Sequence, residues 1–201
     1  MKIFAVIHNY GTPCPDALMG EGKTTWYEMP DSSVLRSGNP FFVPDSDTEY
    51  LAFPSVCYRI GRLGKSIAPR FARRYIDAAT IAVAVVAANR LREARRDGMP
   101  WTEATAFDRS CMLGNLTPID TFIEYGPAEI GFGDRTITYD TALLRLQADR
   151  LVEAVSTGNT LKNGDLILAG LTSEGIRLNP GMRITAEIAE TDMKLIDINI
   201  R

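Results

Sequence analysis

The side chains that most often carry protons in enzymes are scarce in this chain. Its single histidine is His8, whose imidazole could serve as a general base because the reference pKa of histidine is about 6.5. No carboxylate lies within a few residues to orient the ring, so a structural histidine at the end of a buried strand is the favoured interpretation. A mechanism or a zinc site that needs two histidines is excluded.

The three cysteines, Cys14, Cys57 and Cys111, are odd in number and far apart, unlike a disulfide framework or a zinc site built on close pairs. We expect reduced thiols. In a strand, Cys57 would share one face with Phe53 and Arg59 because side chains alternate. A buried, inert thiol is the favoured interpretation of Cys57. A reactive thiol is the alternative, since Arg59 adds a positive charge to that face.

Basic residues form the other conspicuous group. They could contact an anion or a polyanion, but Asp77, Glu93 and Asp97 are interleaved with them, and a solvated face of ion pairs is favoured. With 22 basic and 25 acidic residues the net charge is −3, which gives no reason to expect nucleic acid or an anionic membrane as a partner. The basic residues are Arg70, Arg73, Arg74, Arg90, Arg92, Arg95 and Arg96.

These residues are positioned by a fold of ordinary composition. The chain has 201 residues, of which 45% are hydrophobic and 23% charged, as is typical of one soluble globular domain over residues 1–201. The longest apolar stretch, residues 78–88, is about half a membrane span. The apolar start ends at His8 and is too short for a signal peptide. We therefore expect a cytoplasmic protein with no membrane partner.

Strand signals outnumber helix signals. A helical stripe of apolar residues covers 140–156 and ends at Gly158, and a second helix is predicted over residues 87–96. The run 80–86 mixes β-branched residues with alanines, and periodicity does not decide between strand and helix. The fold class is therefore α+β, mostly β. Strands are predicted at 1–8 and near 40–44, 50–60, 135–139, 165–169 and 182–200.

Several segments are similar, in order and spacing, to motifs of the fumarylacetoacetate hydrolase family. Residues 161–175, LKNGDLILAGLTSEG, resemble the family's TL-x-PGD-x-I-x-TGTP-x-G, and residues 58–67, YRIGRLGKSI, resemble VVIGKxGKxI. The remaining similar segments are Trp101 with 107–114 (FDRSCMLG), residues 8–10 (HNY, where members have RNY) and residues 30–35 (PDSSVL).

This resemblance implies an α+β, mostly β domain of short mixed sheets rolled around one core, commonly in homodimers. It also implies hydrolysis, decarboxylation or isomerisation of 2-oxo and enol acids, with a magnesium or calcium ion held by carboxylates. The family's Glu-x-Glu falls here on Phe53 and Ser55, and its aspartate falls on or near Ala84. Because no carboxylate remains at these positions, we predict no bound metal and no other cofactor.

Other polar residues lie in the segments that resemble the family's site. The lysine expected before FD is Thr105. The leading hypothesis is a divergent member without metal-dependent C–C hydrolysis, which binds a small organic acid with Arg59 as its anchor. One alternative is an active hydrolase, isomerase or decarboxylase that uses no metal or other ligands. Another is a structural or regulatory dimer partner. The pocket candidates are His8, Arg59, Thr105, Asp108 and Thr172.

Overall fold

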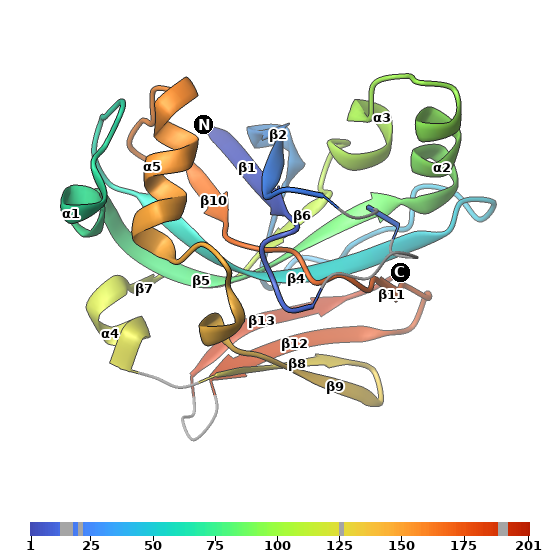
Figure 1. Cartoon of the computed structure of the whole chain (residues 1–201). Helices are drawn as coiled ribbons and strands as arrows, with labels where there is room; N and C mark the ends of the chain where they lie inside the picture. The colour runs from blue at the N-terminus through green and yellow to red at the C-terminus, as the bar shows by residue number, and fades with distance from the viewer. Residues whose placement is uncertain (13–17, 20–21, 125–126, 189–192) are drawn as a thin grey trace.

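The computed structural model describes residues 1–12, 18–19, 22–124, 127–188 and 193–201. The strands in these ranges form a large sheet of nine strands and a small sheet of four (Figure 1). The large sheet has the order β2-β1-β10-β4-β5-β6-β3, with β11 also paired to β4 and β7 to β5. The small sheet has the order β13-β12-β8-β9. The α+β, mostly β architecture expected from the sequence is confirmed.

The strands of the large sheet are β1 (Lys2–Ile7), β2 (Thr25–Pro30), β3 (Val34–Arg36), β4 (Tyr50–Ile60), β5 (Ile76–Ala87), β6 (Cys111–Leu113), β7 (Thr117–Pro118), β10 (Leu166–Leu168) and β11 (Ile176–Arg177). Those of the small sheet are β8 (Ala128–Phe132), β9 (Arg135–Tyr139), β12 (Arg183–Ile188) and β13 (Lys194–Asn199). The helices are α1 (Pro69–Ala72), α2 (Ala88–Arg96), α3 (Thr102–Thr105), α4 (Ile119–Glu124) and α5 (Ala148–Gly158).

The long antiparallel pair β4 and β5 runs through the middle of the molecule. In Figure 1 the small sheet lies below it, and β1, β2, α2 and α3 lie above it. Both faces of β5 are covered, since every residue from Ala78 to Ala87 is buried. A strand buried on both faces has no alternation of apolar and polar residues. This explains why periodicity left 80–86 undecided, and the structure makes it a strand.

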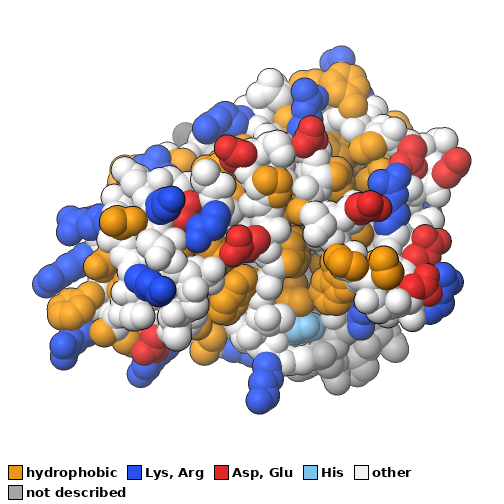
Figure 2. All heavy atoms as spheres, turned by 90° about the horizontal axis from the view of Figure 1, so that it is seen from above, with side chains coloured by type: hydrophobic (Ala, Val, Ile, Leu, Met, Phe, Trp, Pro, Cys, Tyr) orange, Lys and Arg blue, Asp and Glu red, His pale blue; other side chains and the backbone are white. Residues whose placement is uncertain are grey.

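Buried side chains divide into two clusters. The larger, the main core, includes the interface between the sheets and the inner face of α5. The smaller, here called the upper cluster, lies on the upper face of β4 and β5. Its buried members are Ile3, Ala5, Ile7, Met19, Met29, Phe53, Cys57, Ala82, Ala84, Val86, Leu91, Ala104, Ala106, Cys111, Leu113, Leu166, Leu168 and Leu171. Hydrophobic side chains are visible in the middle of this face (Figure 2).

Two predicted elements differ from the structure. The helix expected over 140–156 is a 3-10 turn, Thr141–Leu143, followed by α5 from Ala148. The stripe is interrupted because the backbone N–H groups of Arg145 and Leu146 donate to the backbone and side-chain oxygens of Asn9. The strand expected near 40–44 is reduced to one bridge, between Phe41 and Ile200, because prolines 40 and 44 flank it and cannot donate.

The other expected elements are present. The strand predicted at 182–200 is the pair β12 and β13, and the helix predicted over 87–96 is α2. Among the residues that the structure describes, no helix is long and apolar enough to cross a membrane.

Candidate functional site

Three positions singled out by motif spacing lie together on β4 and β5. Phe53 is the register partner of Ala84, and Ser55 is the partner of Ala82. On the next strand, Ala84 pairs with Cys111 of β6. Phe53, Ser55 and Ala84 have no exposed surface. Phe53, Ala84 and Cys111 thus form one row across three strands, beneath the upper face.

The ring of Phe53 packs directly against the backbone of Gly175. A Cβ atom added to Gly175 would lie 2.5 Å from Cζ and 2.9 Å from Cε2 of Phe53. Such distances are too short for real carbon atoms, so the ring closes against the glycine backbone just before β11. A side chain at 175 would displace the ring, and the glycine is required for this close approach.

The third position, Ser55, already uses its hydroxyl group. The hydroxyl donates to the carbonyl oxygen of Val56 at 2.8 Å and accepts a hydrogen bond from the backbone N–H of Gly170 at 3.0 Å. Magnesium and calcium need about six to eight oxygen ligands, chiefly carboxylates, carbonyls and waters. Within the described ranges, no group of three or more His, Cys, Asp or Glu side chains could hold a metal ion. The residues at these positions do not fit such an ion.

The loop after β10 is held by a network of buried hydrogen bonds. The hydroxyl of Tyr139 donates to the carbonyl oxygen of Gly170 at 2.7 Å. The amide of Asn9 donates to the carbonyl of Ala169 at 2.7 Å and to that of Leu146 at 3.0 Å. Its side-chain oxygen accepts from the N–H of Leu146 at 2.8 Å. Burial raises the pKa of Tyr139, which keeps its hydroxyl a donor.

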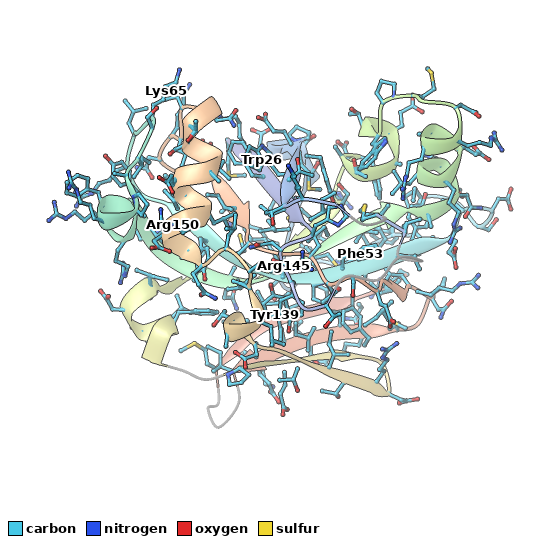
Figure 3. All side chains as sticks on the ribbon, viewed as in Figure 1. Trp26, Phe53, Lys65, Tyr139, Arg145 and Arg150 are labelled. Atoms are coloured by element: carbon cyan, nitrogen blue, oxygen red, sulfur yellow. The ribbon has the colours of Figure 1, made fainter. Side chains whose placement is uncertain are left out.

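Tight packing reinforces this network. The rings of Tyr10 and Tyr139 stack with centroids 4.1 Å apart, and Tyr139 lies between the two sheets, lower in Figure 3 than Phe53. A Cβ atom on Gly170 would come within 2.8 Å of Leu144 and 3.2 Å of Tyr10. The loop therefore has a fixed position at the end of β10.

Cys57 and Cys111 are buried in the upper cluster. Burial raises the pKa of Cys111 to about 12 and raises that of Cys57 as well. Both are thiols at neutral pH, and a thiol is not the nucleophilic form. Cys14 lies outside the described residues.

Tyr27 is a site residue that the sequence analysis missed. Its side chain packs against the upper cluster, and its hydroxyl oxygen is buried with no hydrogen-bond partner in the described part of the chain. The signal available was the run of threonines and aromatic residues at 24–27, a composition typical of strands.

Thr172, one of the pocket candidates, lies beside the strand that carries two of the expected metal positions, and its hydroxyl donates to the carbonyl of Glu174 at 2.9 Å. The backbone N–H of Thr172 donates to the carbonyl of Pro54 at 3.3 Å. The N–H of the preceding residue, Leu171, donates to the carbonyl of Val6 in β1. His8 follows β1 in a left-handed conformation, with φ of 61°. The histidine is visible at the edge of the upper face (Figure 2).

The other candidates are engaged elsewhere or exposed. Thr105 is buried, and its hydroxyl donates to the carbonyl of Trp101 at 3.0 Å. Asp108 is exposed. Arg59 pairs with Asp77 through two hydrogen bonds of 2.8 and 3.0 Å, and hydrogen bonding to this carboxylate raises the pKa of Arg59. Six residues of extended strand, about 20 Å, separate Arg59 from Phe53.

Comparison with known proteins agrees with this fold. The family model described as fumarylacetoacetate (FAA) hydrolase C-terminal matches residues 2–196, and the chain belongs to this family. It is 26% identical over 208 residues to the mitochondrial oxaloacetate decarboxylase of Dictyostelium discoideum, covering 100% of this chain and 94% of the relative. It is 24% identical to a mitochondrial oxaloacetate tautomerase of Caenorhabditis elegans, over 75% of this chain and 72% of that protein.

A solved structure shows the same fold. Fumarylpyruvate hydrolase from Pseudomonas aeruginosa, determined in complex with Mn²⁺ and pyruvate, superimposes with a TM-score of 0.86 at 18% identity. The superposition covers 100% of this chain and 90% of that one.

Proposed function

From this family membership and the geometry of the site, we propose that the chain binds a small organic acid of the 2-oxo or enol class on the upper face of the large sheet. In this proposal it does not perform metal-dependent C–C bond hydrolysis. The observation that carries the proposal is the pairing of Phe53 with Ala84, two buried apolar residues, where the family resemblance implies carboxylates.

The chemistry of these positions favours an apolar ligand body over an ion. A hard cation in this cluster would be surrounded by hydrocarbon and thiol groups, and burying a charge without partners is strongly unfavourable. An apolar surface with a few polar groups is the usual form of a small-molecule site. Thr172 follows the cluster residue Leu171, and His8 follows the cluster residue Ile7, so both polar residues border the cluster along the chain.

A second candidate is an enzyme that acts on such acids without a metal. Relatives named as an oxaloacetate decarboxylase and an oxaloacetate tautomerase favour it. Tautomerisation moves a proton between carbon and oxygen, and a general acid–base pair can perform it. His8 is the only imidazole in the chain and is the residue to test. A homodimer and a cytoplasmic location stay predictions from the sequence.

The experiment separates these functions by their need for metal. Purified protein is mixed with oxaloacetate or phenylpyruvate in buffer with EDTA, and in buffer with Mg²⁺. Binding is followed by the melting temperature and turnover by NMR against protein-free buffer. We expect at least one acid to raise the melting temperature, because a ligand at 100 times its Kd adds about 2.7 kcal/mol to the free energy of unfolding. The rise should be equal in both buffers, since no metal takes part in binding. We expect no turnover.

The other outcomes are informative. Turnover that persists in EDTA and is lost in His8→Ala would support the second candidate. Turnover or stabilisation that requires Mg²⁺, and is abolished in Ser55→Ala, would overturn the proposal, because it would place an ion at positions that we find unsuited to it.

A further inference from the structure

The Tyr27 hydroxyl is an unpaired donor inside the upper cluster. Tyr27 lies on β2, opposite Ala5 of β1, and packs against the cluster. Its hydroxyl oxygen is buried and has no hydrogen-bond partner in the parts of the chain that the structure describes. Leaving a buried polar group unpaired costs about 1–3 kcal/mol, so such a group calls for an explanation.

Tyr27 packs against residues from distant strands of the large sheet. In the strand order, β1, β10, β4 and β5 separate β2 from β6. Tyr27 nevertheless packs against the same cluster that contains Cys111 of β6, and the pKa of Tyr27 is raised first by its burial and then by the charge that Cys111 would carry as a thiolate. Cys111 is the partner of Ala84, and Ala84 is the partner of Phe53. Tyr27 therefore packs against the cluster that contains this row and two of the expected metal positions.

The surroundings define what the hydroxyl can do. The raised pKa keeps Tyr27 protonated, so at neutral pH it is a neutral donor. The Cys111 thiol beside it is protonated as well, and sulfur is a weak acceptor. The buried members of the upper cluster are otherwise hydrocarbon side chains, apart from the thiol of Cys57 and the methionine thioethers. What the hydroxyl lacks is an oxygen acceptor.

We propose that the Tyr27 hydroxyl is the hydrogen-bond donor that positions the ligand of the upper cluster. The ligand is a 2-oxo acid with one carboxylate and an aromatic or aliphatic body, and one of its oxygen atoms accepts the Tyr27 hydrogen bond. A dicarboxylate is disfavoured, because a second carboxylate placed against this cluster of buried apolar side chains would lose its hydration. This inference rests on the proposed function and names the substrate class and the residue that selects it.

The chain offers a matched control in Tyr139, whose buried hydroxyl is paired with the carbonyl of Gly170 at 2.7 Å. Tyr27→Phe and Tyr139→Phe remove the same atom. If the Tyr27 hydroxyl is paired only when a ligand is bound, the urea concentration at which Tyr27→Phe unfolds is equal to that of the parent protein or higher. Tyr139→Phe unfolds at a lower concentration, since a partner is left unpaired.

Affinity is the second readout, measured by calorimetry with phenylpyruvate and oxaloacetate. We expect the parent protein to bind phenylpyruvate more tightly than oxaloacetate. We expect Tyr27→Phe to weaken phenylpyruvate binding about tenfold or more, which corresponds to about 1.4 kcal/mol. Tyr139→Phe should keep the parent affinity within about twofold.

Each contrary outcome has its own meaning. If phenylpyruvate binds the parent protein and Tyr27→Phe equally well, the Tyr27 inference is overturned while the proposed function stands. A Tyr27→Phe variant that loses as much stability as Tyr139→Phe, at unchanged affinity, also overturns the inference. If neither acid binds the parent protein, the proposed function fails, and the inference fails with it.

Discussion

The loop after β10 and the upper cluster adjoin each other on β4, yet they differ in whether their buried polar groups are hydrogen-bonded. Around the loop, the side chains of Asn9, Ser55 and Tyr139 all make hydrogen bonds of 3.0 Å or less. In the upper cluster the Tyr27 hydroxyl has no partner among the described residues. The loop network pairs its polar groups within the protein, whereas the cluster contains a donor with no acceptor in the described part of the chain.

This difference separates the scaffold from the site. The loop belongs to the segment that most resembles the family, and its bonds fix β10 against β1, β4 and β9. The carboxylates that the family resemblance implies are replaced by Phe53, Ser55 and Ala84, which lie on the paired strands β4 and β5. A fold can therefore keep the bonds that build it while its reactive positions change, because the two sets of residues share only Ser55.

The largest effect is expected from placing a carboxylate in the upper cluster. Phe53→Glu should lower the free energy of unfolding by about 3–5 kcal/mol at pH 7, the range for an uncompensated buried charge. Phe53→Leu, the control, should cost less than about 1.5 kcal/mol. Urea denaturation measures both. The loss in Phe53→Glu should shrink as the pH falls, because burial raises a carboxyl pKa and the protonated form is tolerated.

Recovery of Phe53→Glu by millimolar Mg²⁺ would contradict this picture. It would mean that neighbouring oxygens complete an ion site once one carboxylate is supplied, and the cluster would then differ from a metal site by a single residue.

A smaller but still large effect is expected at Asn9. Asn9→Ala removes two donated and two accepted hydrogen bonds and leaves the buried carbonyl of Ala169 without this donor. We expect a loss of about 3 kcal/mol, the upper part of the range for unpaired buried groups. Asn39→Ala, which removes one bond from an exposed asparagine, should change the stability by less than about 0.5 kcal/mol. Equal losses in the two variants would show that the loop network does not stabilise the fold.

Ser55 is where the two regions meet, and its effect should be intermediate. Ser55→Ala leaves the N–H of Gly170 without its acceptor, and we expect a loss of about 1–2 kcal/mol. Thermal denaturation with and without Mg²⁺ checks it. The loss should be independent of Mg²⁺, and a loss seen only in its presence would make Ser55 a metal ligand.

Sequence patterns predicted the features that depend on neighbouring residues and missed those that depend on distant ones. Motif spacing along β4 and β5 selected Phe53 and Ala84, which the structure pairs, because residue count along a strand fixes position. The helix expected at 140–156 begins late because Asn9, more than a hundred residues away, binds its first turns. Tyr27 was missed because the residues that surround its side chain come from strands distant in the sequence.

The smallest effect is expected at Arg59, which the sequence analysis selected as the anchor for a carboxylate. Its guanidinium is paired with Asp77 at the far end of β4 from Phe53, and both side chains are partly exposed. Exposed ion pairs contribute about 1 kcal/mol or less, so Arg59→Ala and its matched control Asp77→Ala should each cost no more than that. The phenylpyruvate affinity of both variants should stay within about twofold of the parent value, because Tyr27 rather than Arg59 packs against the cluster that contains Phe53 and Ala84. A tenfold loss of affinity in Arg59→Ala, together with an unchanged affinity in Tyr27→Phe, would move the ligand to the other end of β4 and restore Arg59 as its anchor.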